Sequence, residues 1–163
     1  MGAVLARHLQ DTSRVRFARD LEAWGDNVAL VADGDREVSY RELARLADEF
    51  AERLPNTVRL LAIETRNTLE SVVAYLGALR RGTPIIKFAA GGLAGDLLAR
   101  YKPDAIYSRT PRTGGWILTF QPQKRRVAPH PDLALMLSTS GSTGEPKLVR
   151  LSAANLPAVH GHR

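Results

Sequence analysis

The chain of 163 residues contains no cysteine, and aromatic residues make up only 6% of it. The absence of cysteine excludes disulfides, a thiolate nucleophile and a cysteine-based zinc site. No apolar run reaches the length of a membrane span. The first twenty residues alternate charged with apolar side chains, which is unlike a secretory signal. We therefore expect a cytoplasmic protein that has no membrane partner.

Acidic residues are fewer than basic ones, which gives a net charge of +6. A basic protein can have a nucleic-acid partner. The one dense basic cluster, Lys124-Arg125-Arg126, lies between Pro122 and Pro129. It has no interleaved aromatic residues and no helix-turn-helix or zinc spacing. This pattern favours a solvated loop, and we expect no nucleic-acid partner, although a basic nucleic-acid-binding module stays open as an alternative.

Apolar runs of strand length alternate with amphipathic segments that begin at polar capping residues. Ser39 with Glu42, and Asn67 with Glu70, have the spacing of a helix N-terminus. Strands are expected at residues 28–32, 36–40, 58–63, 84–88, 104–107, 116–120, 133–137 and 149–151, and helices at 39–54, 67–82 and 92–100. This alternation predicts an α/β fold, with a mainly parallel sheet and helices on both faces.

Several other residues have an ordinary structural interpretation. Gly91-Gly92-x-x-Gly95 lacks the full spacing of a dinucleotide-binding loop and is expected to form a turn. Glu64 and Glu70 are not spaced as a catalytic pair, and we assign them solvent or capping roles. Trp24 and Trp116 are expected to pack within the fold.

The segment "LMLSTSGSTGEPKLV", residues 135–149, places a polar loop between two apolar runs. Gly141 and Gly144 allow a close approach of the backbone, and backbone N–H groups in such loops bind anions. The hydroxyl groups and Lys147 add further donors, so the segment suits a polyphosphate. It is not a Walker A loop, because Glu145-Pro146 follows Gly144 where that motif needs Lys and Ser or Thr. A second strand is expected at Val149–Leu151, so the segment as a whole is predicted to be a strand–loop–strand element.

Residues 139–147, Thr-Ser-Gly-Ser-Thr-Gly-Glu-Pro-Lys, resemble the phosphate-binding signature of the adenylate-forming superfamily at nine consecutive positions. That superfamily includes acyl-CoA synthetases, luciferases and the adenylation domains of nonribosomal peptide synthetases. Residues 38–43, Val-Ser-Tyr-Arg-Glu-Leu, and Asn155 are also similar to the family pattern, whereas Leu148 stands where glycine is commoner. The resemblance extends over residues 15–157, nearly the whole chain.

The resemblance implies an ATP-dependent ligase. In this family a carboxylic acid reacts with ATP to give an acyl-adenylate, and the thiol of CoA or of a phosphopantetheine carrier then takes the acyl group. Mg²⁺ assists the reaction. The nucleotide-binding residues that the resemblance implies here are Thr139, Ser140, Gly141, Ser142, Thr143, Gly144 and Lys147.

The family's motifs for adenine, ribose, Mg²⁺ and the acyl group, and its small C-terminal domain with the catalytic lysine, lie beyond the signature. We therefore expect residues 1–163 to be the N-terminal segment of an adenylation domain, incomplete and inactive by itself. No catalytic residue and no metal ligand is assigned within it. A non-catalytic remnant or interaction module remains the second alternative.

Overall fold

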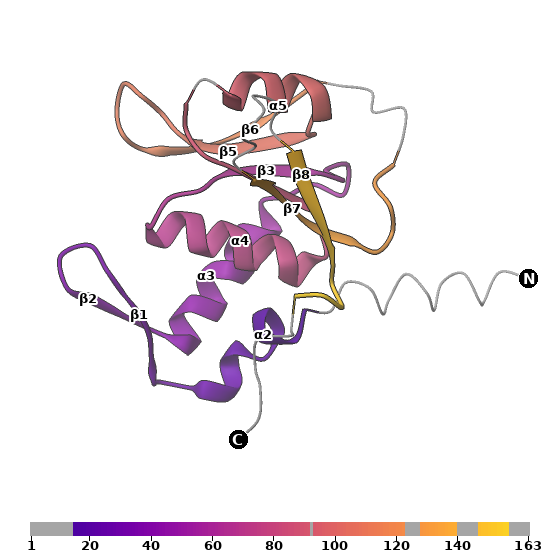
Figure 1. The fold of residues 1–163 in the computed structure, drawn as a ribbon. Coiled ribbons are helices and arrows are strands. Elements are labelled where there is room, and N and C mark those ends of the chain that lie inside the picture. The colour runs from indigo at the N-terminus through magenta and orange to yellow at the C-terminus, as the bar shows by residue number, and fades with distance from the viewer. Residues whose placement is uncertain (1–14, 92, 123–127, 140–146, 157–163) are drawn as a thin grey trace, which may run out of the picture.

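The computed structural model describes residues 15–91, 93–122, 128–139 and 147–156. Its centre is a six-stranded sheet in the order β6-β5-β3-β4-β7-β8 (Figure 1). The four inner strands are parallel, and β6 and β8 pair antiparallel at the two edges. The strands are β3 (Leu61–Glu64), β4 (Ile85–Phe88), β5 (Ala105–Arg109), β6 (Trp116–Phe120), β7 (Leu133–Thr139) and β8 (Lys147–Ser152). The predicted mainly parallel sheet is confirmed.

Helices cover both faces of this sheet, as predicted. Helices α3 (Tyr40–Glu52) and α4 (Leu69–Arg81) lie on one face, and α5 (Leu93–Tyr101) lies on the other (Figure 1). Ile63 and Ile85 belong to the core under α3 and α4, whereas Ala62 and Ile86 belong to the core under α5. Successive side chains of a strand point to opposite faces, so strands covered on both faces are apolar at most positions.

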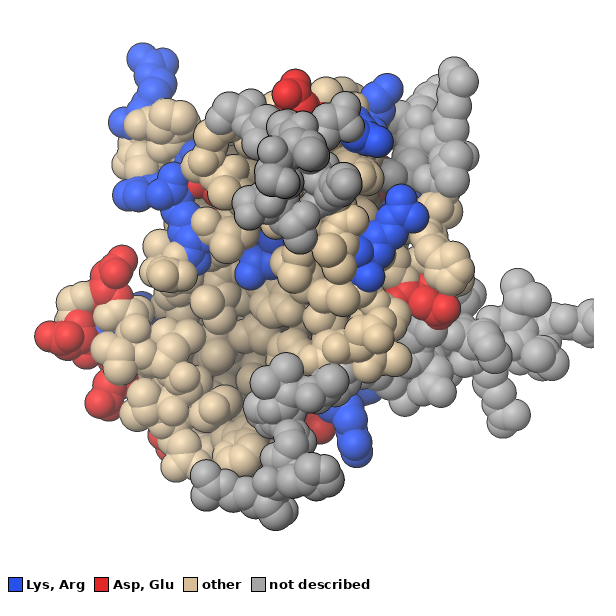
Figure 2. All heavy atoms as spheres, in the orientation of Figure 1, with Lys and Arg blue, Asp and Glu red and all other residues tan. Residues whose placement is uncertain are grey.

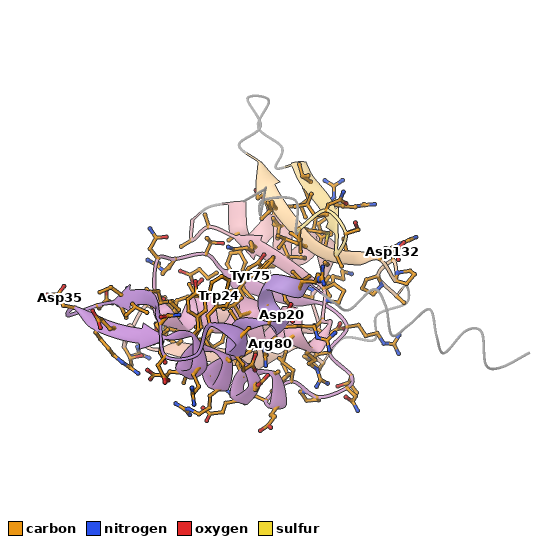
Figure 3. All side chains as sticks on the ribbon, turned by 90° about the horizontal axis from the view of Figure 1, so that it is seen from below. Asp20, Trp24, Asp35, Tyr75, Arg80 and Asp132 are labelled. Carbon is orange, nitrogen blue, oxygen red and sulfur yellow. The ribbon has the colours of Figure 1, made fainter. Side chains whose placement is uncertain are left out.

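A small N-terminal unit precedes the sheet. It consists of α2 (Arg16–Arg19), a 3₁₀ turn η1 (Leu21–Trp24) and the antiparallel hairpin of β1 (Val28–Ala32) and β2 (Arg36–Ser39). The predicted hairpin is confirmed, but Tyr40 begins α3 instead of ending β2. The hairpin projects from the body of the molecule, with Asp35 near its tip (Figures 1 and 3).

Capping residues set the helix ends, and one of the two predicted caps was wrong. The Ser39 hydroxyl accepts a hydrogen bond from the amide of Glu42 at 3.1 Å, as the sequence predicted. Helix α4 is instead capped by Thr68, whose hydroxyl accepts from the amide of Ser71 at 3.4 Å. Asn67 and Thr68 are adjacent polar residues, so spacing alone did not distinguish them.

The tryptophan predictions were half right. Trp116 is partly buried against the main core and stacks on Tyr107, with ring centroids 5.0 Å apart. Trp24 is 57% exposed and contacts only the ring of Tyr40 among the aromatic side chains described, so it is not a core residue. Within the described residues, no helix is both long enough and apolar enough to cross a bilayer.

Candidate functional site

The two ends of the nine-residue signature lie opposite each other in an antiparallel hairpin. Thr139, the last residue of β7, pairs with Lys147, the first residue of β8, and Ser138 pairs with Leu148. The predicted strand–loop–strand arrangement is therefore confirmed at its two ends. The strands extend further than expected, because Thr139 and Lys147 are themselves part of the ladder. Ser140, Gly141, Ser142, Thr143 and Gly144 lie outside the described residues, as do the side chains of Thr139 and Lys147.

The signature begins at the carboxyl edge of the parallel strands. β3, β4 and β5 end at this same edge, at Glu64, Phe88 and Arg109. The chain leaves β3 toward α4 on one face, and it leaves β4 toward α5 on the other. In open α/β sheets, ligands bind outside the carboxyl ends of strands where neighbouring connections diverge in this way. β7 lies directly beside β4, so the fold brings the signature to such an edge.

Glu64 links β3 to β5 at this edge. Its side chain is buried, and its Oε2 accepts a hydrogen bond from the backbone N–H of Arg109 at 3.0 Å. Its Oε1 lies 2.5 Å from Nε of Arg66. The predicted solvent or capping role of Glu64 was therefore wrong. A buried carboxylate needs such partners, since its desolvation is otherwise costly.

Lys87 is a half-buried cation near the same edge, and no sequence motif singled it out. It pairs in register with Leu137, two residues before the signature, and its Nζ lies 4.8 Å from the ring centre of Tyr75. Burial lowers the pKa of the Lys87 ammonium group and raises the pKa of the Tyr75 hydroxyl. A lysine within the apolar strand Ile-Ile-Lys-Phe was the available signal.

Positive charge at this edge suits a polyphosphate. Arg66, Lys87 and Arg109 all lie at or next to the ends of the parallel strands, and Glu64 balances one of these three charges. Figure 2 shows Lys and Arg mainly in the upper half of the molecule, over the sheet, whereas Asp and Glu gather at the left around the β1–β2 hairpin. Among the described residues, no group of three or more His, Asp or Glu side chains is placed to hold a metal ion. Mg²⁺ commonly reaches proteins together with substrate phosphates and then needs few protein carboxylates.

Comparisons with known proteins identify the fold. No protein-family model matches the sequence, and no curated protein matches it significantly. Solved structures do match. The N-terminal subdomain of Klebsiella oxytoca NpsA, in complex with 3-hydroxybenzoyl-AMSN, is 25% identical with a TM-score of 0.64, over 86% of this chain and 41% of that one.

Two further solved structures are similar. Apo MatB from Rhodopseudomonas palustris is 21% identical, with a TM-score of 0.66, over 90% of this chain and 36% of that one. VinN in complex with L-aspartate is 20% identical, with a TM-score of 0.64, over 85% of this chain and 47% of that one. All three are adenylate-forming enzymes. The chain spans less than half the length of each, and its fold is that of their N-terminal part, which confirms the resemblance drawn from the signature.

Proposed function

We propose that this chain is the N-terminal segment of an ATP-dependent carboxylate ligase that forms an acyl-adenylate. One observation carries the proposal. The two ends of the nine-residue signature, Thr139 and Lys147, pair between β7 and β8, at the carboxyl edge of a sheet similar to that of adenylate-forming enzymes. The resemblance in sequence and the resemblance in fold are separate lines of support for the same reaction.

In the proposed reaction, a carboxylate oxygen attacks the α-phosphorus of ATP and pyrophosphate leaves. A thiol, from CoA or a phosphopantetheine carrier, then attacks the acyl carbon and AMP leaves. We assign residues 139–147 to the β- and γ-phosphates, with hydroxyl groups, backbone N–H groups and Lys147 as donors. Negative charge grows on the departing pyrophosphate, so preorganised donors aimed at it lower the barrier.

The remaining assignments follow from the same proposal. The substrate is a carboxylic acid, the nucleotide is ATP with Mg²⁺, and the protein acts in the cytoplasm without a nucleic-acid partner. Residues 1–163 contribute phosphate binding and no catalytic group. The segment alone is therefore inactive, because one loop cannot position adenine, acyl group and attacking atom together.

Binding of Mg²⁺–tripolyphosphate to the 163-residue chain tests the assignment of the loop. We expect Lys147→Ala and Thr143→Ala each to weaken binding at least roughly tenfold, since each removes a donor to charged oxygens. The matched control is Arg150→Ala, which removes an exposed cation from the same strand. Equal affinities of the wild type and the Lys147 variant contradict the assignment.

Carboxylate-dependent ATP–pyrophosphate exchange tests the reaction. We expect none from residues 1–163. In a longer protein that contains this segment, Lys147→Ala and Thr143→Ala should each slow exchange by roughly 100-fold, the usual cost of one preorganised donor, with unchanged thermal melts. Robust exchange by the 163-residue chain contradicts its role as an incomplete segment. Phosphate binding without exchange in the longer protein supports a non-catalytic remnant.

A further inference from the structure

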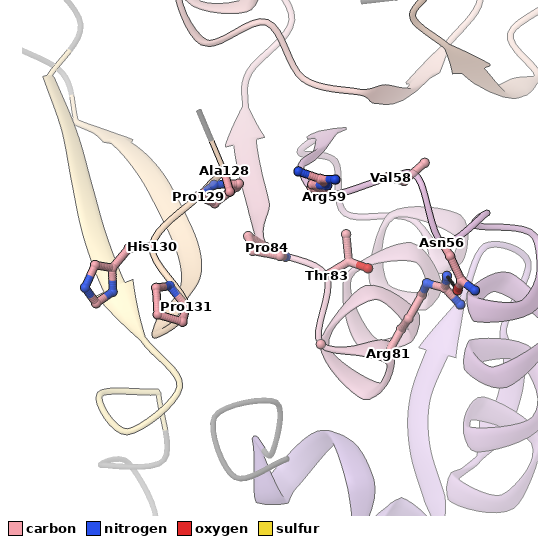
Figure 4. Close-up of a pocket in the computed structure, with 11 residues that line it drawn as sticks. Asn56, Val58, Arg59, Arg81, Thr83, Pro84, Ala128, Pro129, His130 and Pro131 are labelled. Carbon is pink, nitrogen blue, oxygen red and sulfur yellow. Dashed lines mark hydrogen bonds between the residues drawn. The ribbon is translucent and has the colours of Figure 1, made fainter. Parts of the chain in front are cut away.

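A pocket of about 430 Å³ opens at the opposite, amino edge of the sheet (Figure 4). One wall comes from the segments that precede β3 and β4, and the other from the segment that precedes β7. Pro84, which lines the pocket, directly precedes β4, whereas Phe88 at the other end of that strand faces the signature edge. Four strand residues span roughly 13 Å. The pocket is therefore separate from the site proposed for ATP.

The first wall carries several hydrogen-bond donors. The Nη2 of Arg81 donates to Oδ1 of Asn56 at 2.7 Å, which leaves the Asn56 amide nitrogen as a donor. The backbone N–H of Arg59 donates to Oδ2 of Asp104 at 3.0 Å and fixes that residue in place. Within the described part of the chain, the guanidinium of Arg59 itself forms no ion pair or hydrogen bond. The guanidinium of Arg59 is therefore available to a ligand.

Thr83 is the strongest sign of a ligand in this pocket. It is only 6% exposed, it lines the pocket, and its backbone N–H donates to the carbonyl of Ala78 at 2.9 Å. Its hydroxyl has no hydrogen-bond partner among the residues that the structure describes. Buried hydroxyl groups are nearly always paired, so an unpaired one indicates a water or a ligand that completes the site.

The second wall is largely apolar. Ala128, Pro129 and Pro131 contribute aliphatic surface, and His130 lies between the two prolines. The Nδ1 of His130 accepts a hydrogen bond from the amide of Asp132 at 3.2 Å, which leaves its Nε2 to donate. The ligand would therefore have a charged group toward the arginines and an uncharged part toward the prolines.

The electrostatics of the pocket select an anion. Arg59 and Arg81 line it, and no Asp or Glu is among its lining residues. The carboxyl end of α4 contributes a partial negative charge, but only about half an elementary charge. The Gly82 and Thr83 amides also satisfy the last-turn carbonyls of Leu79 and Ala78. Two full cationic charges therefore outweigh the dipole.

We propose that this pocket binds a small phosphomonoester. Its donors come from three chain segments, those that precede β3, β4 and β7, and donors spread in this way can reach more oxygens of a tetrahedral phosphate than of a planar carboxylate. Guanidinium groups bind phosphate by paired hydrogen bonds. A volume of about 430 Å³ exceeds what inorganic phosphate needs and is in the range of small-molecule sites. The proline wall takes the organic part of the ester.

Amide NMR titration of the 163-residue chain with glycerol phosphate tests the proposal. We expect saturable shifts at Gly82, Thr83 and His130. Arg59→Gln should weaken binding at least tenfold, and Thr83→Val, which keeps the side-chain shape, at least threefold. Arg150→Gln is the matched control for loss of one positive charge and should leave the affinity unchanged.

Each other outcome decides against the proposal. Equal weakening by Arg59→Gln and Arg150→Gln indicates non-specific attraction of anions. Succinate that binds as tightly as glycerol phosphate overturns the phosphate assignment. Inorganic phosphate that binds equally tightly overturns the role of the proline wall. Lys147→Ala should leave glycerol phosphate binding intact, so a failure here is distinguishable from a failure of the ATP-loop assignment.

Discussion

Arg80 of α4 holds Asp48 of α3 by two hydrogen bonds, from Nε to Oδ1 at 2.6 Å and from Nη2 to Oδ2 at 2.8 Å. The same guanidinium donates to Oε1 of Glu22 at 2.6 Å and to the carbonyl of Ala18 at 2.7 Å. Its side chain is only 12% exposed. Arg80, labelled in Figure 3, thus joins the N-terminal unit to both helices on this face of the sheet. The hydrogen bonds that Arg80 donates to Asp48 raise the pKa of the Arg80 guanidinium, which stays charged.

We expect Arg80→Leu to lower the free energy of unfolding by about 2 kcal/mol, because it leaves two carboxylates and the carbonyls of Ala18 and Arg19 without this donor. The carboxylates are half exposed, which keeps the loss below that of a fully buried pair. Urea unfolding measures it. The control is Arg45→Leu, which removes only an exposed pair with Glu49 and should cost less than about 0.5 kcal/mol. Equal losses in the two variants contradict a special role for Arg80.

The pairing of Glu22 with Arg80 makes stability depend on pH. The hydrogen bond from Arg80 lowers the pKa of Glu22 below its ordinary value of 4.5. The folded state therefore binds its proton less readily than the unfolded state does. The resulting stabilisation is fully present above pH 4.5 and is lost as the pH falls through the folded-state pKa.

Thermal melts between pH 6 and pH 3 measure this effect. We expect Glu22→Gln to reduce the fall in melting temperature below about pH 4.5, because one titrating group is removed. A wild-type and a Glu22→Gln curve that run parallel over this range would show that the ion pair contributes nothing.

The sequence predicted the order and type of the elements from β1 to β8, because strands covered on both faces are mostly apolar. It did not predict α2 or η1. Their ends depended on contacts between distant residues. The sequence predicted a strand from residue 58, but β3 begins at Leu61. The amides of Arg59 and Leu60 instead donate to Oδ2 of Asp104, at 3.0 and 2.9 Å. A carboxylate 45 residues away from Arg59 leaves no local pattern.

The signature was predictable because its residues are consecutive. The rest of the carboxyl edge was not, since Glu64, Lys87 and Arg109 come from three strands that only the parallel pairing brings together. The pocket at the amino edge was even less predictable from the sequence. Arg59, Thr83 and His130 form no motif of regular spacing in the sequence. Each lies in a segment between elements, and only the strand order brings these segments together.

Gly77 allows the close contact of α3 and α4. A Cβ added there would lie 2.5 Å from the carbonyl oxygen of Ala47 and 3.1 Å from the Phe50 ring. We expect Gly77→Ala to cost about 2 kcal/mol, because a backbone atom must move. A Cβ added at Gly95 of α5 would meet nothing within 4 Å, so Gly95→Ala should gain up to about 1 kcal/mol from helix propensity. Urea unfolding of both variants compares them, and the same sign for the two changes would contradict the helix contact.

Replacing Glu64 measures how much one buried carboxylate at the carboxyl edge stabilises the protein. Its two oxygens accept from the Arg109 amide and from Nε of Arg66, and an amide side chain has only one acceptor atom. We therefore expect Glu64→Gln to lower the free energy of unfolding by about 1–3 kcal/mol, since one donor loses its partner. Glu52→Gln, an exposed change of the same chemistry at the end of α3, should stay within about 0.5 kcal/mol. Urea unfolding measures both. A Glu64→Gln variant as stable as the wild type would mean that this carboxylate does not hold β3 and β5 together.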